Sequence, residues 1–161
     1  MGIDTLVAEP KRDALDTIEK LCIEYNIKVA IHNHPKPSIY WNPDTVLEAI
    51  KGRSPLMGAC ADTGHWVRSG LDPVDCLRKL EGRIITLHFK DLSAKPDTGA
   101  KPHDVPWGTG ISNAKGMMLE LKRQKFRGSF CVEYEYNWEN STPEIAQCVD
   151  FFNTSCAELA R

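Results

Sequence analysis

The chain has 161 residues, of which 42% are hydrophobic and 26% are charged, and its formal net charge is −2. This composition is ordinary for one globular domain and excludes a largely disordered chain, while the acidic balance lowers the expectation of a nucleic-acid partner. No apolar run approaches the roughly 18 residues that span a bilayer and the first residues do not resemble a signal peptide, so we expect a cytoplasmic protein without a membrane partner.

The expected elements alternate between strands and helices along the chain. Short apolar runs predict strands at 5–8, 28–32, 56–62, 83–88 and 129–135. Apolar residues at helical spacing predict helices at about 15–25, from Asn42-Pro43, from Asp72-Pro73, around Met117–Leu121 and from Thr142-Pro143. A long polar loop, residues 92–112, separates the fourth strand from the fourth helix, and loops of this length are usually functional or disordered.

Five successive β/α units predict a parallel α/β sheet in a single domain, residues 1–161. They do not close an eight-stranded barrel, whose usual length is about 250 residues. The chain is therefore either an open sheet or the C-terminal part of a barrel from which three units are missing. We favour the barrel, because residues at the ends of successive strands converge in a barrel and fan apart in an open sheet.

Three apolar runs in the predicted strands each end on a residue type that binds metals, namely Asp62, His88 and Glu133. Side chains alternate along a strand, so the small residues Gly58 and Cys60 share a face with Asp62. The inward face of a barrel must fit a narrow interior, and it opens onto the active site where the strands end. The pattern predicts two carboxylates and an imidazole at a barrel mouth, a donor set that suits Mn²⁺, Mg²⁺, Co²⁺ or Zn²⁺.

Purely structural interpretations of these residues remain open. Asp62 could cap a helix, His88 could be a buried histidine bonded to backbone, and Glu133 competes with Glu135 on the same face. Lys90 could stabilise an oxyanion or form a surface ion pair. The six cysteines include no C-x-x-C pair, and we expect them to be small core residues in a reducing compartment.

The loops hold further candidates. His32 and His34 could bind the metal or supply a second proton, or could merely shape a proline-rich loop. His65 could contact substrate or pack beside Trp66. Residues 105–110 predict a substrate-side loop, because glycines permit a close approach of the backbone, and Trp107 within it could stack on a sugar or cover the barrel.

Four motifs in order along the chain resemble the xylose isomerase-like barrel superfamily, and most closely its sugar phosphate isomerase/epimerase group. They are Ala61-Asp62-Thr63-Gly64-His65, Leu87-His88-Phe89-Lys90-Asp91, Val105-Pro106-Trp107-Gly108-Thr109-Gly110 and Cys131-Val132-Glu133-Tyr134-Glu135. The resemblance implies a (β/α)₈ TIM barrel, present here as roughly its last five units. It also implies that Asp62, His88 and Glu133 bind metal and that His65 contacts a substrate oxygen. The family's epimerases have a glutamate at the position of His32, so a two-glutamate mechanism is in doubt.

We expect the metal ligands to be Asp62, His88, Glu133 and His32. The catalytic groups are Glu133, His65, His32 and Lys90, with Glu133 as the base. The substrate-binding residues are His65, His34, Trp107 and Arg68.

The predicted function is a metal-dependent isomerase or epimerase that acts on a sugar, sugar phosphate or keto-sugar through a metal-stabilised enediolate. The same metal and base could instead eliminate a β-substituent, which would make the protein a lyase on an oxidised sugar. An endonuclease IV-like repair enzyme that uses His103 is a third interpretation, and an inactive barrel fragment is a fourth. We expect a carbohydrate substrate, and either a missing N-terminal barrel segment or a second copy as a partner.

Overall fold

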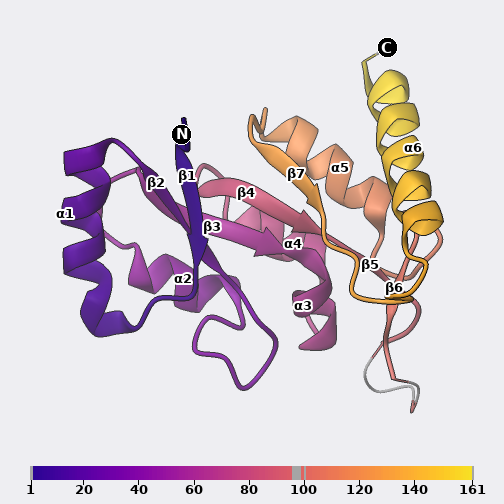
Figure 1. Ribbon diagram of the computed structural model, residues 1–161, viewed down its shortest axis with the longest axis horizontal. Coiled ribbons are helices and arrows are strands. Elements are labelled where there is room, and N and C mark those ends of the chain that lie inside the picture. The colour runs from indigo at the N-terminus through magenta and orange to yellow at the C-terminus, as the bar shows by residue number, and fades with distance from the viewer. Residues whose placement is uncertain (1, 96–98, 100, 161) are drawn as a thin grey trace.

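The computed structural model describes residues 2–95, 99 and 101–160, and its centre is a five-stranded sheet (Figure 1). The strands are β1 Thr5–Ala8, β2 Lys28–His32, β3 Met57–Asp62, β4 Ile84–Phe89 and β7 Ser129–Val132, in the order β1-β2-β3-β4-β7. Every neighbouring pair is parallel, so all five strands end at the same edge of the sheet. The predicted parallel α/β architecture is therefore confirmed.

Six α-helices connect the strands and follow them. They are α1 Leu15–Tyr25, which follows the short 3-10 helix η1 Arg12–Ala14, α2 Pro43–Ala49, α3 Thr63–Arg68, α4 Pro73–Lys79, α5 Ala114–Arg123 and α6 Thr142–Leu159. Helices α2 and α4 begin at Pro43 and Pro73, and α6 begins at Thr142, the residue before Pro143. The side chains of Asn42 and Asp72 accept hydrogen bonds from backbone N–H groups of the first turns of α2 and α4, which explains where these two helices start.

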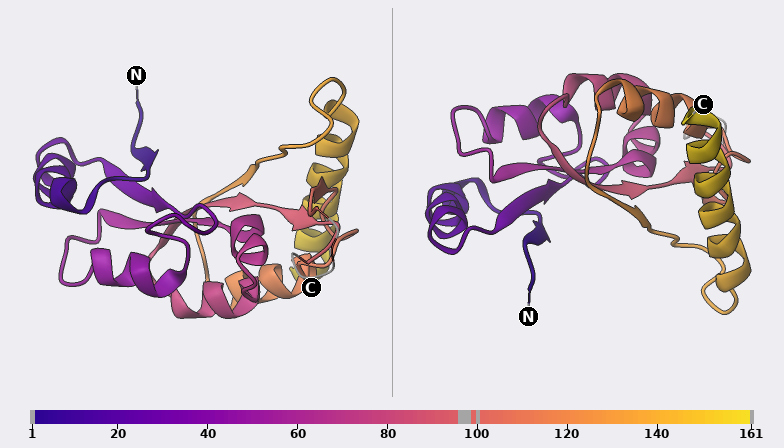
Figure 2. Two further views of the ribbon diagram at one scale, coloured as in Figure 1. Left: turned by 90° about the horizontal axis from the view of Figure 1, so that it is seen from below. Right: turned by 90° about the horizontal axis from the view of Figure 1, so that it is seen from above.

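The helices cover one face of the sheet. Helices α2, α4 and α5 lie along this face, while α1 and α6 lie at its two ends (Figure 2). The core forms between this face and the helices, where strand residues such as Ile31, Leu87 and Phe89 pack in one cluster with Leu77 and Met117. Along each strand the intervening residues point to the opposite face, which carries no helix in the described part of the chain.

Both outer edges of the sheet are unpaired within the described residues, because β1 and β7 are its first and last strands. Leu6 and Val7 on β1 are 49% and 44% exposed. Leu21, Ile23 and Tyr25 on the adjacent α1 are also exposed. This end of the sheet therefore presents an apolar surface with an open hydrogen-bonding edge.

Three expectations need correction. The last strand ends at Val132, so Glu133 and Glu135 lie just beyond it and not within it. The predicted loop at 92–112 overlaps a small antiparallel hairpin, in which β5 Asp91–Leu92 pairs with β6 Asp104–Val105. Cys131 and Cys156 are exposed, so the interpretation of the cysteines as core residues holds only for the other four.

Within the described ranges, no helix combines the length and apolarity that crossing a membrane requires.

Candidate functional site

Asp62, the last residue of β3, lies at the centre of the candidate site. Its Oδ1 accepts a hydrogen bond from the backbone N–H of His65 at 2.8 Å, so the predicted helix-cap role is real. Its backbone is held by the Asn33 side chain, which accepts from the Asp62 N–H at 2.8 Å and donates to the Asp62 carbonyl at 2.9 Å. The other carboxylate oxygen, Oδ2, is buried without a hydrogen bond. This burial raises the pKa of Asp62.

His32, His88 and Glu133 form a contiguous row beside Asp62. The sheet register pairs Asp62 with His88, and it pairs His32 on β2 with Cys60 on β3. As a result His32 Nε2 lies 2.9 Å from His88 Nδ1, which lies 3.0 Å from Glu133 Oε2. The three predicted strand-end residues and His32 are thus brought together at one end of the sheet.

The donor atoms of this cluster fit a divalent cation. One atom each from His32, Asp62, His65 and Glu133 lie within 4.8 Å of one another, as do atoms from His32, Cys60 and His88. Asp62 Oδ2 belongs to the first group. It accepts no hydrogen bond, although the Lys90 ammonium lies 3.2 Å away, and a buried carboxylate oxygen of this kind is one that a metal ion satisfies. Imidazole and carboxylate groups are also a suitable donor set for Zn²⁺, Co²⁺ or Mn²⁺.

Lys90 is buried against the same carboxylates, so its interpretation as a member of a surface ion pair is wrong. Its Nζ lies 3.2 Å from Asp62 Oδ2, 2.9 Å from Glu133 Oε2 and 2.5 Å from Glu135 Oε2. Burial disfavours the charged amine, but the carboxylates outweigh it and raise the pKa of Lys90. Burial alone would raise the pKa of Glu133, yet contacts with His88, Asp62 and Lys90 lower it. Lys90 therefore remains a cation beside an ionised Glu133.

His65 and Arg68, both on α3, extend the site on its other side. His65 Nε2 lies 3.4 Å from Asp62 Oδ2, and its Nδ1 lies 3.1 Å from Arg68 Nη1. Burial, followed by the nearby charges of Lys90 and Arg68, lowers the pKa of His65 to about 2. His65 is therefore a neutral imidazole. Arg68 also donates to Asp104 at 2.6 Å.

The remaining predicted residues lie at the rim or outside the site. His34 Nδ1 contacts Glu9 Oε2 at 2.6 Å, and its half-exposed ring lies 4.3 Å from that of His32. Trp107 is 4% exposed and packs on Phe89 in the core, with ring centroids 4.6 Å apart. Trp107 is consequently not placed to stack on a sugar, and the prediction for it is wrong.

His103, the residue that a nuclease interpretation would use, stacks on Tyr136 with ring centroids 4.2 Å apart and bonds to Ser93. Within the described part of the chain, it belongs to none of the groups that could hold a metal ion.

Two residues of the site carry no obvious signal in the sequence. Asn33 positions Asp62, and only its place between His32 and His34 hints at a role. Asp104 is buried in the long loop, where it accepts from Arg68 and, through its second oxygen, from the backbone N–H of Glu135 at 2.6 Å. An ion pair between residues 36 positions apart leaves no local pattern that sequence reasoning could find.

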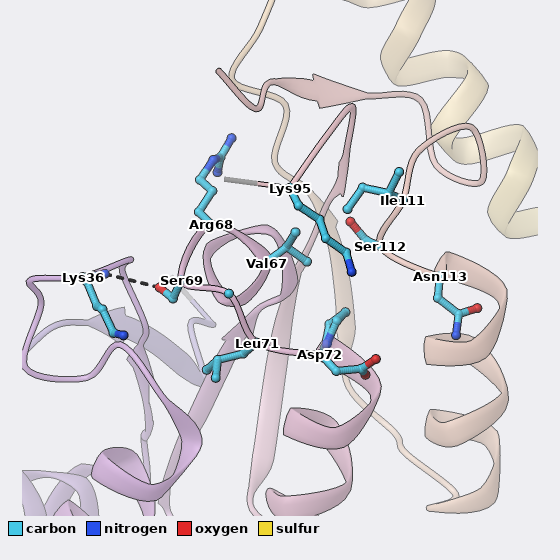
Figure 3. A pocket seen from close by; sticks show the side chains of 12 residues that line it. Lys36, Val67, Arg68, Ser69, Leu71, Asp72, Lys95, Ile111, Ser112 and Asn113 are labelled. Atoms are coloured by element: carbon cyan, nitrogen blue, oxygen red, sulfur yellow. Dashed lines mark hydrogen bonds between the residues drawn. The ribbon is translucent and has the colours of Figure 1, made fainter. Parts of the chain in front are cut away.

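A separate pocket of about 550 Å³ lies beside α3 and is lined by residues that include Arg68, Leu71, Asp72, Lys95 and Ser112 (Figure 3). None of the clustered residues around Asp62 lines it. In Figure 3 the Arg68 side chain points away from Leu71 and Asp72. The pocket thus adjoins the candidate site through Arg68 without containing its chemistry.

Comparisons with known proteins identify a family and several relatives for this chain. The family model described as "Xylose isomerase-like TIM barrel" matches residues 11–154. The crystal structure of a putative uncharacterized protein from Parabacteroides distasonis is 42% identical with a TM-score of 0.66, and the match covers 95% of this chain and 59% of that one. Inosose dehydratase from Clostridium tetani is 35% identical over 79 residues, which cover 48% of this chain and 26% of that protein. Inosose dehydratase 2 from Bacillus cereus is 24% identical over 139 residues, which cover 79% of this chain and 47% of that protein. The chain thus spans about half, or less, of the length of these curated relatives.

Proposed function

Because the chain belongs to the xylose isomerase-like TIM barrel family, as an incomplete barrel of five strands, we propose that it removes a proton next to the carbonyl of a carbohydrate-like substrate. His32, Asp62, His88 and Glu133 would hold a divalent cation. His32, Asp62 and Glu133 belong to one group of neighbouring donor atoms, and His88 Nδ1 lies 2.9 Å from His32 and 3.0 Å from Glu133. When bound, such an ion polarises the carbonyl and stabilises the negative charge that develops as the proton leaves.

Glu133 is the proposed base. Its pKa is lowered, so it stays ionised, and it lies at the open edge of the cluster with its side chain 34% exposed. Lys90 is the proposed proton donor, because its raised pKa keeps it charged and its Nζ lies 2.9 Å from Glu133. Glu133 can therefore take up one proton from the substrate while Lys90 delivers another to it.

We favour elimination of water over epimerisation, and the observation that carries this choice is the imidazole of His32 at 2.9 Å from His88. An epimerase must remove a proton from one face of a carbon and return one to the other. The resemblance implies a glutamate at this position for that task, and this chain has no carboxylate there. In an elimination, Glu133 takes the proton next to the carbonyl, a C=C bond forms, and the neighbouring C–O bond breaks as Lys90 protonates the departing hydroxyl.

The relatives named inosose dehydratase support this order of preference. The epimerase or isomerase that the sequence first favoured becomes the second candidate, because it would share the same initial proton removal. Inosose, the substrate in the relatives' names, is the first compound to test, followed by other keto-sugars.

The test is to incubate the protein with Zn²⁺, Co²⁺ or Mn²⁺ and an inosose in D₂O. We expect water and a dehydrated ketone as products, the latter as the unsaturated enol or its 1,2-diketone tautomer, and deuterium next to the carbonyl of recovered substrate. Glu133→Gln should lower both by at least about 100-fold, since it keeps the shape and removes the base. Glu139→Gln, which changes an exposed glutamate outside the cluster, is the matched control.

Deuterium incorporation into an isomeric sugar without an unsaturated product would favour the epimerase. Cleavage of abasic DNA without exchange into any tested sugar would favour the nuclease. Absence of metal binding by equilibrium dialysis would leave an inactive fragment.

A further inference from the structure

We infer that Arg68 locks His65 in the tautomer that carries its proton on Nε2, which makes His65 a fixed hydrogen-bond donor and removes it from the metal ligands. Arg68 is then a positioning residue that acts through His65, in place of the substrate-binding role predicted for it. The substrate part of this inference rests on the proposed function, whereas the tautomer itself does not.

The tautomer of His65 follows from which of the neighbouring groups can donate a hydrogen bond. A guanidinium has only N–H donors and no acceptor, so in the 3.1 Å contact between Arg68 Nη1 and His65 Nδ1 the arginine must donate. The lone pair of His65 Nδ1 therefore accepts this hydrogen bond from Arg68, and Nδ1 carries no hydrogen. A neutral imidazole then has its single N–H on Nε2, the atom that lies 3.4 Å from Asp62 Oδ2.

Arg68 is itself held in place. Its Nη2 donates to Asp104 Oδ1 at 2.6 Å, and Asp104 is 1% exposed. The second oxygen of Asp104 accepts from the backbone N–H of Glu135, so the carboxylate is fixed at both ends. Figure 3 shows the Arg68 side chain directed away from Leu71 and Asp72 of the adjacent pocket. The guanidinium thus makes hydrogen bonds to His65 and Asp104, and its Nη1 also lies 3.8 Å from Glu135 Oε2.

The lock decides which of the clustered donors can bind a metal. A histidine binds through an unprotonated nitrogen, and here Nδ1 is occupied by Arg68 while Nε2 carries the hydrogen. His65 is therefore excluded as a metal ligand, although one of its ring nitrogens lies among the candidate donor atoms. An Nε2–H aimed at the site instead selects an acceptor, such as the hydroxyl or carbonyl oxygen of a polyhydroxylated ketone.

The direct test is long-range ¹H–¹⁵N correlation spectroscopy of the metal-free protein, with His65→Gln used to assign the ring. We expect His65 Nδ1 to resonate as an unprotonated nitrogen and Nε2 as a protonated one. Arg68→Met should give a mixture of tautomers, and Arg68→Lys should restore the Nε2–H form in part, because lysine also donates. Arg12→Met, at an exposed ion pair with Glu48, is the control and should leave the His65 signals unchanged.

Metal titration provides the second readout. We expect His65→Gln to bind Zn²⁺ within about 3-fold of the wild-type affinity, whereas His88→Gln should lose more than about 10-fold. An Nδ1–H tautomer in the wild type, an unchanged tautomer in folded Arg68→Met, or a loss in His65→Gln equal to that in His88→Gln would each overturn the inference.

If Arg68→Met does not fold, Asp104→Asn replaces it, and an unchanged tautomer in that variant counts equally against the lock. Failure of the wild type to bind any metal would contradict the proposed function alone, since the tautomer is measured without metal.

Discussion

Asp62 has two roles, which determine how its substitutions behave. Asp62 caps α3 with one oxygen and offers the other to the cluster. His32 approaches His88 within 2.9 Å, and Asn33, the next residue, anchors the Asp62 backbone. Substitutions at Asp62 would therefore mix loss of a cap with loss of a ligand. His32 is the cleaner position, since among the described residues its side-chain contacts all lie within the histidine and carboxylate cluster.

His32 should set the metal preference of the site. Imidazole favours Zn²⁺, whereas an added carboxylate favours Mn²⁺ or Mg²⁺. We expect His32→Glu to lower the ratio of Zn²⁺ to Mn²⁺ affinity by about 10-fold or more, measured by competition titration. His32→Gln, which removes the imidazole without adding a charge, should weaken both ions. An unchanged affinity ratio in His32→Glu would show that His32 is not a ligand.

At the scale of elements, one buried carboxylate organises the loop between β5 and α5. Asp91 Oδ2 accepts from the backbone N–H groups of Gly108 and Gly110 at 2.9 and 3.0 Å, and Oδ1 accepts from those of Leu92 and Ser112. A Cβ on Gly110 would lie 2.4 Å from Asp91 Oδ1, so only glycine allows this approach. The glycines of this segment thus serve a carboxylate of the protein itself.

Asp91→Asn should loosen this loop. Asparagine has only one accepting oxygen, so two of the four N–H groups would face an amide that cannot accept. We expect a loss of about 3 kcal/mol in the free energy of unfolding and faster hydrogen exchange at Gly108 and Gly110, measured by urea titration and exchange spectroscopy. Asp75→Asn, at an exposed ion pair, should change stability by less than about 1 kcal/mol. Unchanged exchange at all four amides, those of Leu92, Gly108, Gly110 and Ser112, would contradict the role assigned to Asp91.

At the scale of the whole molecule, association with other chains is governed by the open face of the sheet and by its two edges, which are unpaired among the described residues. A strand edge with unpaired N–H and C=O groups is a template for pairing with another chain. Here the β1 edge also carries the exposed Leu6 and Val7 and adjoins the apolar surface of α1. Hydrogen bonding and hydrophobic burial therefore both favour association at this edge.

A protein of these 161 residues should self-associate in proportion to its concentration, as measured by analytical ultracentrifugation. Leu6→Lys places a charge on the β1 edge and should shift the distribution towards the monomer. Ile39→Lys changes a residue of similar exposure in a loop and should have no such effect. A wild-type protein that stays monomeric at all concentrations would refute the expectation.

The sequence by itself determined the β/α order, the starts of α2, α4 and α6 and the strand-end residues Asp62 and His88, but it did not predict α3. These features are local: alternation along a strand and caps beside prolines depend on residues a few positions apart. Their convergence also followed, because parallel strands end at a common edge. The resemblance to the family rested on the same short motifs and is confirmed by the family match over residues 11–154.

Only the tertiary structure decided which side chains share an environment. Lys90 could be exposed or buried until the fold placed it among three carboxylates. Trp107 could face a sugar or the core until the fold packed it against Phe89 in the core. The Arg68 contact with Asp104 joins residues 36 positions apart, and the geometry of such a contact is set by sheet register and loop path. No periodicity or cap encodes a contact of this kind, so the chemistry of His65 emerges only once the chain is folded.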